Sequence, residues 1–468
     1  MRCGAGEVAT ACEGALVAGD PSTAVTGVSI DSRTLRPGDA FVALPGSRSD
    51  GHAFAAEAAA RGAAALIVSR WPLPGALPRP LPVILVDDTL AALTRWAAAH
   101  RRRFDVPVVG VTGSVGKTTT KEMVAAVVGR RLRVLKSPGN FNNEIGVPLG
   151  ILAWEQAHGA AVFELAMRGP GEIRRLCDLV QPGIGVVINV REVHLEGLGS
   201  LEAVAAAKAE LIQALPASGA AVLNADDPLV RAMAARTGAR LVTFGLSSDA
   251  LVRAEGLADD HPFRISFTLV WPRGRAPVAI PAAGRHLVHN ALAAAAVALV
   301  LGLPAGDVVD GLAAFRPADR RLAIHEVDGV TVIDDTYNAS PTSLRAALDA
   351  AARLPRAGRL VVVLGDMLEL GPAAGRAHRE AGAWMAAEAD LFLAVGAETA
   401  AAVAEARRCG MAPGAAQHFA DRRELTEALR GLVREGDVVL VKGSRGMAMD
   451  EVADALLTGD GDPSEAGS

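Results

Sequence analysis

Residues 106–120 read VPVVGVTGSVGKTTT, and the rest of the chain is organised around this stretch. Residues 106–111 form a short apolar run with valine at four of its six positions, which predicts one buried strand. A glycine-rich turn follows, and we expect a helix from Thr119 to Val128. This order directs unpaired backbone N–H groups and the positive end of a helix dipole at one anion. The stretch therefore predicts a phosphate-binding loop.

The loop is a shortened variant of the Walker A pattern, because Val111 stands where that pattern has glycine. We expect Lys117 to contact the outer phosphates of a nucleotide and the Thr118 hydroxyl to bind magnesium. The alternative, a glycine-rich turn with an incidental Lys-Thr pair, is disfavoured because strand, loop and helix follow in the required order. The residues expected to hold the nucleotide here are Gly113, Ser114, Gly116, Lys117, Thr118 and Thr119.

Composition limits the possible classes of protein. A chain of 468 residues predicts about three domains, each large enough to bury its own core. Hydrophobic residues make up 50% and aromatic residues only 4%, so the cores must consist mainly of Ala, Val and Leu. A net charge of -5 argues against sequence-independent binding of nucleic acid, and we expect no nucleic-acid partner. The 4 cysteines are too few and too scattered for a disulfide framework or a zinc site.

The sequence predicts neither export nor membrane insertion. Glu7 and Glu13 interrupt the N-terminal stretch where a signal peptide needs apolar residues. The longest apolar run, residues 291–301, is shorter than the roughly 20 residues that cross a bilayer, and we expect it to be a buried helix. We therefore expect a cytoplasmic protein. Residues 458–468 have the composition of a disordered tail.

Apolar runs alternate with helical stretches along most of the chain, which predicts an α/β fold of three domains. We expect a small N-terminal α/β domain at 1–86, a central P-loop domain with a parallel sheet at 87–316, and a C-terminal Rossmann-like domain at 317–468. The predicted strands are 40–44, 64–68, 83–86, 106–111, 161–165, 185–190, 220–223, 240–244, 330–333, 360–364, 391–395 and 437–441, with an antiparallel pair at 264–269 and 277–280. The predicted helices include 53–61, 87–100, 343–352 and 376–387.

Ligands of parallel sheets bind at the carboxyl ends of the strands. In the central domain this rule selects Glu164 at one strand end, and Asn189 and His194 at or just past the next. Taken alone, Glu164 is equally compatible with a carboxylate that caps a strand end, and His194 with a surface histidine. In the C-terminal domain the rule selects a polar cluster that contains Asp335, Lys442 and Ser444. Ser32 and Arg33 taken alone are ordinary turn residues.

Ten segments of the chain together resemble the Mur ligases. In chain order they read TGSVGKTTT, GNFNNEIGVP, ELAMRGPGEI, HLEGLGS, AKAEL, LNADDP, HNALAAAAVA, DDTYNASP, LGDMLELG and KGSRGM. DDTYNASP is similar to the branch of the family that adds D-alanyl-D-alanine, the MurF type. Two positions differ from the family pattern: Arg191 and Val193 stand where small residues are expected, and Arg320 stands where glycine usually precedes a single arginine.

The resemblance implies an ATP-dependent ligase of peptidoglycan synthesis. Its substrates would be UDP-N-acetylmuramoyl-tripeptide, D-alanyl-D-alanine and ATP, with an acyl phosphate as intermediate. It further implies a monomer in which the N-terminal domain holds the nucleotide sugar and the C-terminal domain closes over ATP. Alternatives are another Mur-type or folylpolyglutamate-type ligase, and more remotely a P-loop switch protein. No guanine-recognition motif N-K-x-D supports the last of these.

The resemblance also assigns roles to particular residues. Two magnesium ions would be held by Thr118, Glu164, His194 and Lys208. The catalytic residues would be Lys117, Glu164, His194 and Lys208. By pattern alone Lys208 is a snorkelling surface lysine, but the resemblance implies that it forms a carbamate. Asn290 taken alone is a helix N-cap, whereas in the family it lies near adenine, with His289 beside it. ATP would also be contacted by Arg321 and Asp335, and the uridine diphosphate by Ser32 and Arg33. The muramoyl peptide would be contacted by Asn140, Asn142 and Asn143. The dipeptide would be contacted by Lys442 and Ser444.

Overall fold

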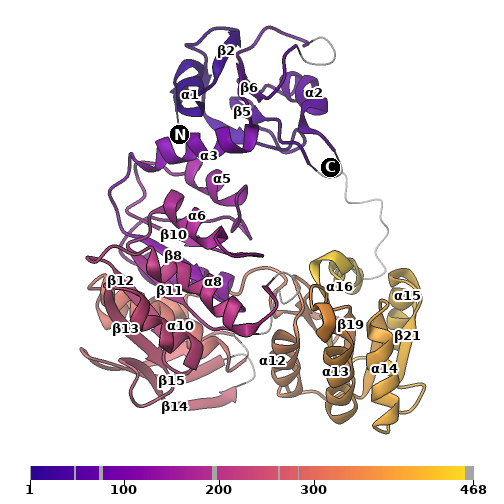
Figure 1. Ribbon diagram of the computed structural model, residues 1–468. Coiled ribbons are helices and arrows are strands. Elements are labelled where there is room, and N and C mark those ends of the chain that lie inside the picture. Colours follow the sequence, from indigo (N-terminus) through magenta and orange to yellow (C-terminus); the bar gives the residue numbers. More distant parts are fainter. Residues whose placement is uncertain are drawn as a thin grey trace.

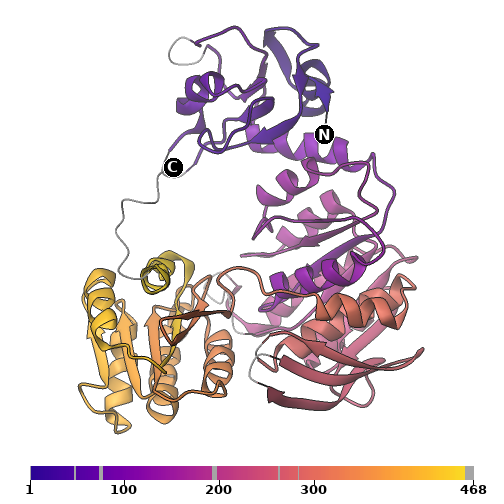
Figure 2. The same cartoon turned by 180° about the vertical axis from the view of Figure 1, so that it is seen from behind.

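The computed structural model describes residues 2–46, 49–72, 77–191, 198–261, 264–282 and 284–458. It has the predicted α/β fold, with three principal sheets that follow one another along the chain (Figure 1). Figure 2 shows the same arrangement from behind, with the N-terminal part at the top and the C-terminal part beside the central sheet. His194, Val193 and residues 459–468 of the predicted tail lie outside the described residues.

The N-terminal part contains a five-stranded sheet in the order β2-β7-β6-β5-β4, and a two-stranded sheet formed by β1 and β3. Small side chains such as Ala58, Ala59 and Ala63 pack against Phe41 and Leu66 on one side of this sheet. The aromatic-poor composition is thus accommodated by close packing of alanine. The elements are β1 Cys3–Gly4, α1 Ala5–Cys12, β2 Ala15–Ala18, β3 Ala24–Val25, β4 Gly27–Ser29, β5 Asp39–Val42, η1 Gly51–Phe54, α2 Ala55–Ala60, β6 Ala65–Val68 and β7 Val83–Leu85.

The central part is built on a nine-stranded sheet in the order β16-β15-β14-β13-β12-β11-β8-β10-β9. The strands from β9 to β14 are parallel, and β14, β15 and β16 form the predicted antiparallel extension. The strands are β8 Val108–Thr112, β9 Val134–Lys136, β10 Ala160–Glu164, β11 Ile184–Val187, β12 Ala220–Asn224, β13 Arg240–Gly245, β14 Val252–His261, β15 Arg264–Trp271 and β16 Gly274–Ile280. The helices are α3 Thr89–Arg101, α4 Lys117–Val128, α5 Gly146–Leu152, α6 Glu172–Val180, α8 Leu201–Gln213, α9 Pro228–Arg231, η2 Ala232–Arg236, α10 Leu287–Val300 and α11 Ala305–Ala313.

Helices cover both faces of the central sheet, as the continuous apolar strands require. On one face, the alanine-rich helix α10 and the P-loop helix α4 pack against Val109, Val111 and Val222. On the other, α5, α6 and α8 pack against Phe163, Val187 and Leu223. Because the carboxyl ends of β8, β10 and β11 share one edge of the sheet, the loops that follow them meet there.

The C-terminal part has a six-stranded sheet in the order β17-β18-β22-β19-β20-β21, in which only the edge strand β17 is antiparallel. This is the predicted doubly wound arrangement. In the described ranges, no helix is long and apolar enough to cross a membrane. The elements are β17 Ala323–Val327, β18 Val330–Asp335, α12 Pro341–Ala352, β19 Leu360–Gly365, η3 Gly371–Ala373, α13 Ala374–Glu388, β20 Leu391–Val395, α14 Thr399–Arg408, β21 Ala416–Phe419, α15 Arg422–Leu432, β22 Val438–Lys442, η4 Arg445–Met447 and α16 Asp450–Leu457.

Candidate active site

The glycine-rich loop connects β8 to α4, as its sequence predicts. Gly116 is the N-cap of α4 and has φ 83°, in the left-handed region that favours glycine. A Cβ at this position would lie 3.1 Å from Nδ2 of Asn290, so both the backbone conformation and the space call for glycine. The first N–H groups of α4, which a helix leaves without an intrahelical acceptor, begin at this residue. The loop therefore leads directly into the N-terminus of α4, where these N–H groups can meet an anion.

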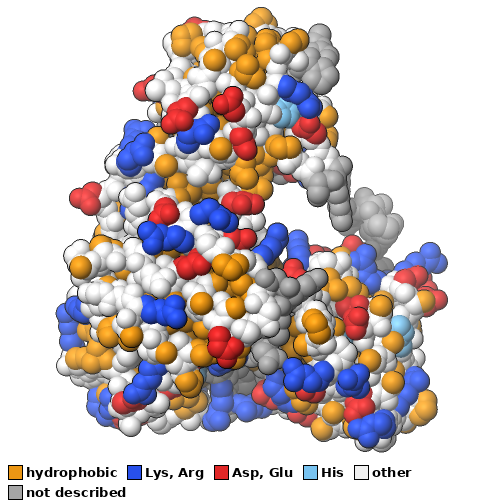
Figure 3. All heavy atoms as spheres, viewed as in Figure 1, with side chains coloured by type: hydrophobic (Ala, Val, Ile, Leu, Met, Phe, Trp, Pro, Cys, Tyr) orange, Lys and Arg blue, Asp and Glu red, His pale blue; other side chains and the backbone are white. Residues whose placement is uncertain are grey.

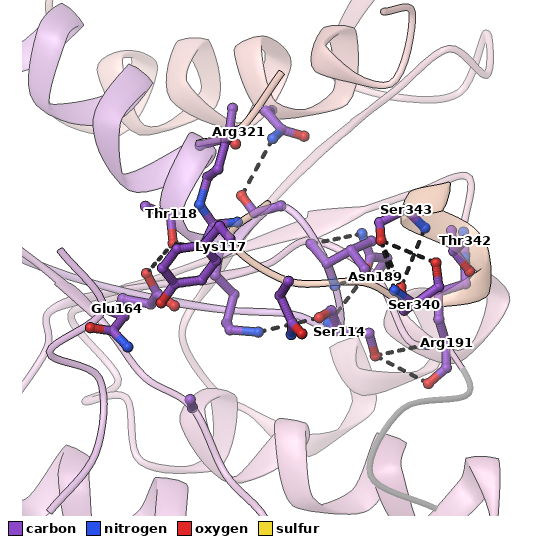
Figure 4. Close-up of a pocket in the computed structure, with 18 of the residues that line it drawn as sticks. Ser114, Lys117, Thr118, Glu164, Asn189, Arg191, Arg321, Ser340, Thr342 and Ser343 are labelled. Atoms are coloured by element: carbon purple, nitrogen blue, oxygen red, sulfur yellow. Dashed lines mark hydrogen bonds between the residues drawn. The ribbon is translucent and has the colours of Figure 1, made fainter. Parts of the chain in front are cut away.

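Asn189, just beyond the end of β11, holds the first half of this loop. Its Oδ1 accepts hydrogen bonds from the backbone N–H of Ser114 at 3.1 Å and of Val115 at 3.0 Å. The expectation that the loop's N–H groups are unpaired is therefore wrong for these two residues. Lys117 Nζ donates to the carbonyl oxygens of Gly113 at 2.9 Å and Ser114 at 3.2 Å, so this cation lies against its own loop (Figure 4).

Arg191, a departure from the family pattern, also braces the loop. Its backbone N–H donates to Ser114 Oγ at 2.8 Å, and its Nη1 pairs with Asp227 Oδ2 at 2.7 Å. Asp227 is buried at the N-terminus of α9 and accepts the N–H of Val190 at 2.9 Å. The arginine thus fixes the chain that leaves β11 between the loop and α9.

Thr118 and Glu164 meet at the strand edge. The Thr118 hydroxyl donates to Glu164 Oε2 at 2.7 Å, and both residues are buried. Asn142 Nδ2 donates to the other carboxylate oxygen, Oε1, at 2.8 Å. The structure therefore brings together two of the four predicted magnesium ligands, and hard oxygen atoms of this kind suit that ion.

Arg321 reaches this cluster from the C-terminal part of the chain. Its Nη2 donates to Thr118 Oγ1 at 3.0 Å (Figure 4). Its guanidinium lies 3.9 Å from the centroid of the Tyr337 ring. Tyr337 belongs to the segment DDTYNASP, and burial raises the pKa of its hydroxyl. A cation from one domain is thereby placed against the phosphate-binding loop of another.

Lys208 is buried on α8 and only 2% exposed, so the prediction of a snorkelling surface lysine is wrong. Burial first, and then the nearby positive charge of Lys117, lower the pKa of the Lys208 amine well below its usual value. Both effects favour the neutral form of the amine over the ammonium. Its burial could not be predicted from the sequence, because a single lysine in an alanine-rich helix is usually a surface residue.

Asn290 is not an N-cap, because α10 begins at Leu287 with His286 as its cap. Asn290 lies in the first turn of the helix and is buried, and its Nδ2 donates to the Gly116 carbonyl at 3.3 Å. His289 Nε2 lies 2.8 Å from Asp226 Oδ2, next to the loop of Leu246 and Ser247. His289 and Asn290 thus contact two different loops of the central domain.

Asp335 and Lys442 occupy the ends of the neighbouring strands β18 and β22 and form a buried ion pair. Lys442 Nζ also donates to the Asn338 carbonyl at 2.9 Å. Ser444 is buried as well, and its Oγ accepts the N–H of Leu368 at 2.8 Å. These polar groups hold the strand-end loops of the C-terminal domain together.

Ser32 and Arg33 lie on the N-terminal domain, away from the phosphate-binding loop. The Ser32 hydroxyl is buried and donates to Glu57 Oε2 at 3.0 Å. Arg33 is 80% exposed and pairs with Asp31 at 2.6 Å. This arginine and its hydrogen bonds lower the pKa of Asp31 to about 2.

A cleft of about 1120 Å³ lies between the central and C-terminal domains. Figure 3 shows the molecule hollowed between its upper part and the C-terminal domain, with Lys and Arg side chains at the rim. Within the part of the chain that the structure describes, no group of three His, Cys, Asp or Glu side chains is arranged to hold a metal ion. The predicted site residues that line the cleft are Ser114, Gly116, Lys117, Thr118, Thr119, Asn140, Asn142, Asn143, Glu164, Asn189, Asn290, Arg321, Asp335 and Lys442.

The loop, the Thr118–Glu164 pair and the arginine from a second domain define a P-loop nucleotide-binding enzyme in which the C-terminal domain contributes a cation at the loop. Three family models match the chain: "Mur ligase family, catalytic domain" at residues 24–101, "Mur ligase middle domain" at 111–298, and "Mur ligase, glutamate ligase domain" at 320–445. The chain belongs to the Mur ligase family.

Similar proteins span nearly the whole chain. Proteins named UDP-N-acetylmuramoyl-tripeptide–D-alanyl-D-alanine ligase from Mycobacterium tuberculosis and Escherichia coli are 40% and 39% identical and cover 93% and 92% of this chain and 93% of their own. A solved structure of MurF from Acinetobacter baumannii has a TM-score of 0.86 and 31% identity, covering 98% of this chain and 99% of its own. MurF ligase from Thermotoga maritima in complex with ADP has a TM-score of 0.78 and 29% identity, covering 93% and 97%.

Proposed function

We propose that this protein is an ATP-dependent ligase that joins D-alanyl-D-alanine to UDP-N-acetylmuramoyl-tripeptide, as the names of its relatives describe. The products would be the pentapeptide precursor of peptidoglycan, ADP and phosphate. The observation that carries the proposal is the contact of Arg321 with Thr118, which places a C-terminal cation at the phosphate-binding loop of the central domain. We further propose that the enzyme works as a monomer in the cytoplasm.

Each domain has its own part in this proposal. Residues 1–86 would bind the uridine diphosphate through Ser32 and Arg33, and residues 87–316 would bind ATP. Residues 317–468 would close over ATP with Arg321 and Asp335, and offer the dipeptide near Lys442 and Ser444. The muramoyl peptide would pass Asn140, Asn142 and Asn143 on its way to the γ-phosphate.

The chemistry requires activation of a free carboxylate. Transfer of the γ-phosphoryl group gives an acyl phosphate, which the dipeptide amine attacks with release of phosphate. The negative charge that gathers during this transfer calls for preorganised cations, which Lys117 and Arg321 would supply. We expect Lys117 to leave the carbonyls of its own loop and turn to the phosphates, since those carbonyls are weaker partners than an anion.

Two magnesium ions would add further positive charge at the transferred group. Thr118 and Glu164 fit such a site because their oxygens are already adjacent, at 2.7 Å. His194 and Lys208 complete the proposed set. A carbamate on Lys208 would form from carbon dioxide and the neutral amine, and both the burial of this lysine and its lowered pKa favour that amine.

The test is phosphate release by the purified protein with UDP-N-acetylmuramoyl-tripeptide, ATP and D-alanyl-D-alanine. Release should require all three, and the pentapeptide nucleotide should accumulate in equal amount. Replacing the dipeptide by single amino acids, or by glutamate with a folate acceptor, separates this activity from those of other Mur-type and folylpolyglutamate-type ligases. Release without the dipeptide, or only with glutamate, would contradict the proposal.

A further inference from the structure

Lys121 is a buried lysine that the proposed chemistry does not use. It lies on α4 three residues after Thr118, and so on the same side of the helix. Its side chain is 0% exposed, which is rare for lysine. Lys121 is not among the described residues that line the cleft. Its burial therefore needs another explanation than contact with a substrate.

The Lys121 amine is directed at a segment without regular structure. Its Nζ donates to the carbonyl oxygens of Ser137 at 2.7 Å and Gly139 at 2.8 Å, and lies 3.4 Å from Glu122 Oε1. Residues 137–145 join β9 to α5 and contain no helix or strand. These contacts use the donors of the ammonium group, and the nearby carboxylate balances its charge.

The same segment also holds Glu164. Ser137 Oγ accepts the backbone N–H of Glu164 at 3.3 Å, and Asn142 Nδ2 donates to Glu164 Oε1 at 2.8 Å. Because Thr118 binds the other oxygen of Glu164, the contacts form a closed ring from α4 through Glu164 and the segment, and back to α4 through Lys121. Lys121 is the only side chain of α4 that closes this ring onto the segment's backbone among the described hydrogen bonds.

We propose that Lys121 is a positioning residue, which fixes residues 137–145 so that their asparagines are ready for the carboxylate-bearing nucleotide-sugar substrate. This rests on the proposed function for the identity of that substrate. Removing the amine takes the charged donor from two carbonyls and lets the segment move away from Glu164. ATP meets the N-terminus of α4 and the dipeptide meets the C-terminal domain, and Glu164 keeps its hydrogen bond from Thr118 when the segment moves. The effect should therefore fall on one substrate of the three.

The kinetic test is Lys121→Met, which keeps the length and apolar stem of the side chain. The KM for UDP-N-acetylmuramoyl-tripeptide should rise by about tenfold or more, the loss expected for charge-assisted hydrogen bonds, while the KM values for ATP and D-alanyl-D-alanine change by less than about threefold. Lys121→Gln, which keeps shorter N–H donors, should give an intermediate KM. If Lys121→Met does not fold, Lys121→Gln decides the question alone.

Lys136→Met is the matched control. Lys136 pairs with the same carboxylate, Glu122, but its side chain is half exposed and does not bind the carbonyls of the segment. This variant should keep the wild-type KM values. The proposal is overturned if the Lys121 variants keep the wild-type KM for the nucleotide sugar, if all three KM values rise together, or if Lys136→Met has the same effect.

Hydrogen exchange tests, without any substrate, whether Lys121 fixes residues 137–145. The amide of Phe141, which donates to the Pro138 carbonyl at 2.9 Å, should exchange about tenfold faster in Lys121→Met than in the wild type or in Lys136→Met. Unchanged exchange would overturn the proposal whatever the enzyme acts on. If exchange becomes faster in Lys121→Met but the wild-type protein releases no phosphate with the three substrates, Lys121 does fix the segment and the proposed function is wrong.

Discussion

The replacement Lys208→Ala tests the most unusual residue of the proposed site. If Lys208 carries a carbamate, the variant loses an anionic oxygen ligand of the proposed magnesium site. The expected loss of activity is about a thousandfold, which corresponds to about 4 kcal/mol of transition-state stabilisation at 1.36 kcal/mol per tenfold change. The measurement is steady-state phosphate release at saturating substrates.

A small carboxylate can enter the space that the shortened side chain leaves. Formate or acetate should therefore restore part of the activity of Lys208→Ala, because either supplies the missing anionic oxygen. The same additions should leave Lys117→Ala inactive, since that variant lacks a cation. Wild-type enzyme stripped of carbon dioxide should lose activity and regain it with bicarbonate.

The pH dependence of stability gives a second measurement. Folding lowers the pKa of Lys208 below its usual value of 10.5. At any pH between these two pKa values, Lys208 is protonated in the unfolded chain but neutral in the folded protein. The free energy of unfolding should therefore rise with pH across this window, in buffer free of carbon dioxide. In Lys208→Met, which keeps the volume, this part of the slope should vanish. Full activity of Lys208→Ala, or an unchanged slope in Lys208→Met, would refute the reasoning.

Three further replacements probe the loop and the closing domain. Lys117→Ala should abolish phosphate release and leave the unfolding midpoint nearly unchanged, and retention of more than about a tenth of the activity would argue against its role. Asn189→Ala removes the acceptor of two loop N–H groups, so calorimetry should show ADP binding weakened by about tenfold. Unchanged binding would show that these two hydrogen bonds do not contribute to the affinity for the nucleotide. A chain that ends at Phe315 should still bind ATP in an equilibrium assay but form no pentapeptide, and product from it would exclude the closure model.

Much of the fold could be predicted because its strands are apolar runs between turn residues. β10, β12, β19 and β20 lie within a residue or two of their predicted bounds. β14 was missed because its sequence, VRAEGLADDH, carries charges at several positions. The three-residue strand β9 was missed because a run that short has no period to detect.

The site was predictable only where residue type itself carries the chemistry. Thr118 at the start of α4 and Glu164 at the end of β10 are each suggested by their own motif or strand end, and the resemblance to the Mur ligases implied that they share a magnesium site. The burial of Lys121 and Lys208 could not, because a lysine between helical residues reads as a surface residue and only tertiary packing decides otherwise. Asn290 was misplaced by one helical turn, since the sequence before it gives no clear N-cap.

The backbone around Arg321 explains how that side chain reaches the other domain. Its neighbours Arg320 and Leu322 have φ 60° and φ 52°, in the left-handed region that costs non-glycine residues about 1 kcal/mol or more each. The family pattern, with glycine before the arginine, fits this requirement at position 320. Here Arg320 forms ion pairs with Asp450 at 2.9 Å and Asp454 at 3.0 Å on α16, which fix the turn to that helix.

The same turn is fixed from the other side by the segment DDTYNASP. The backbone N–H of Tyr337 donates to the Arg320 carbonyl at 3.1 Å, and the N–H of Leu322 donates to Asp335 Oδ1 at 3.2 Å. Asp335 is in turn held by Lys442. These contacts leave Arg321 between the Tyr337 ring and Thr118. The turn that carries Arg321 is therefore fixed by α16, β18 and β22 together, which holds the guanidinium in place beside Thr118.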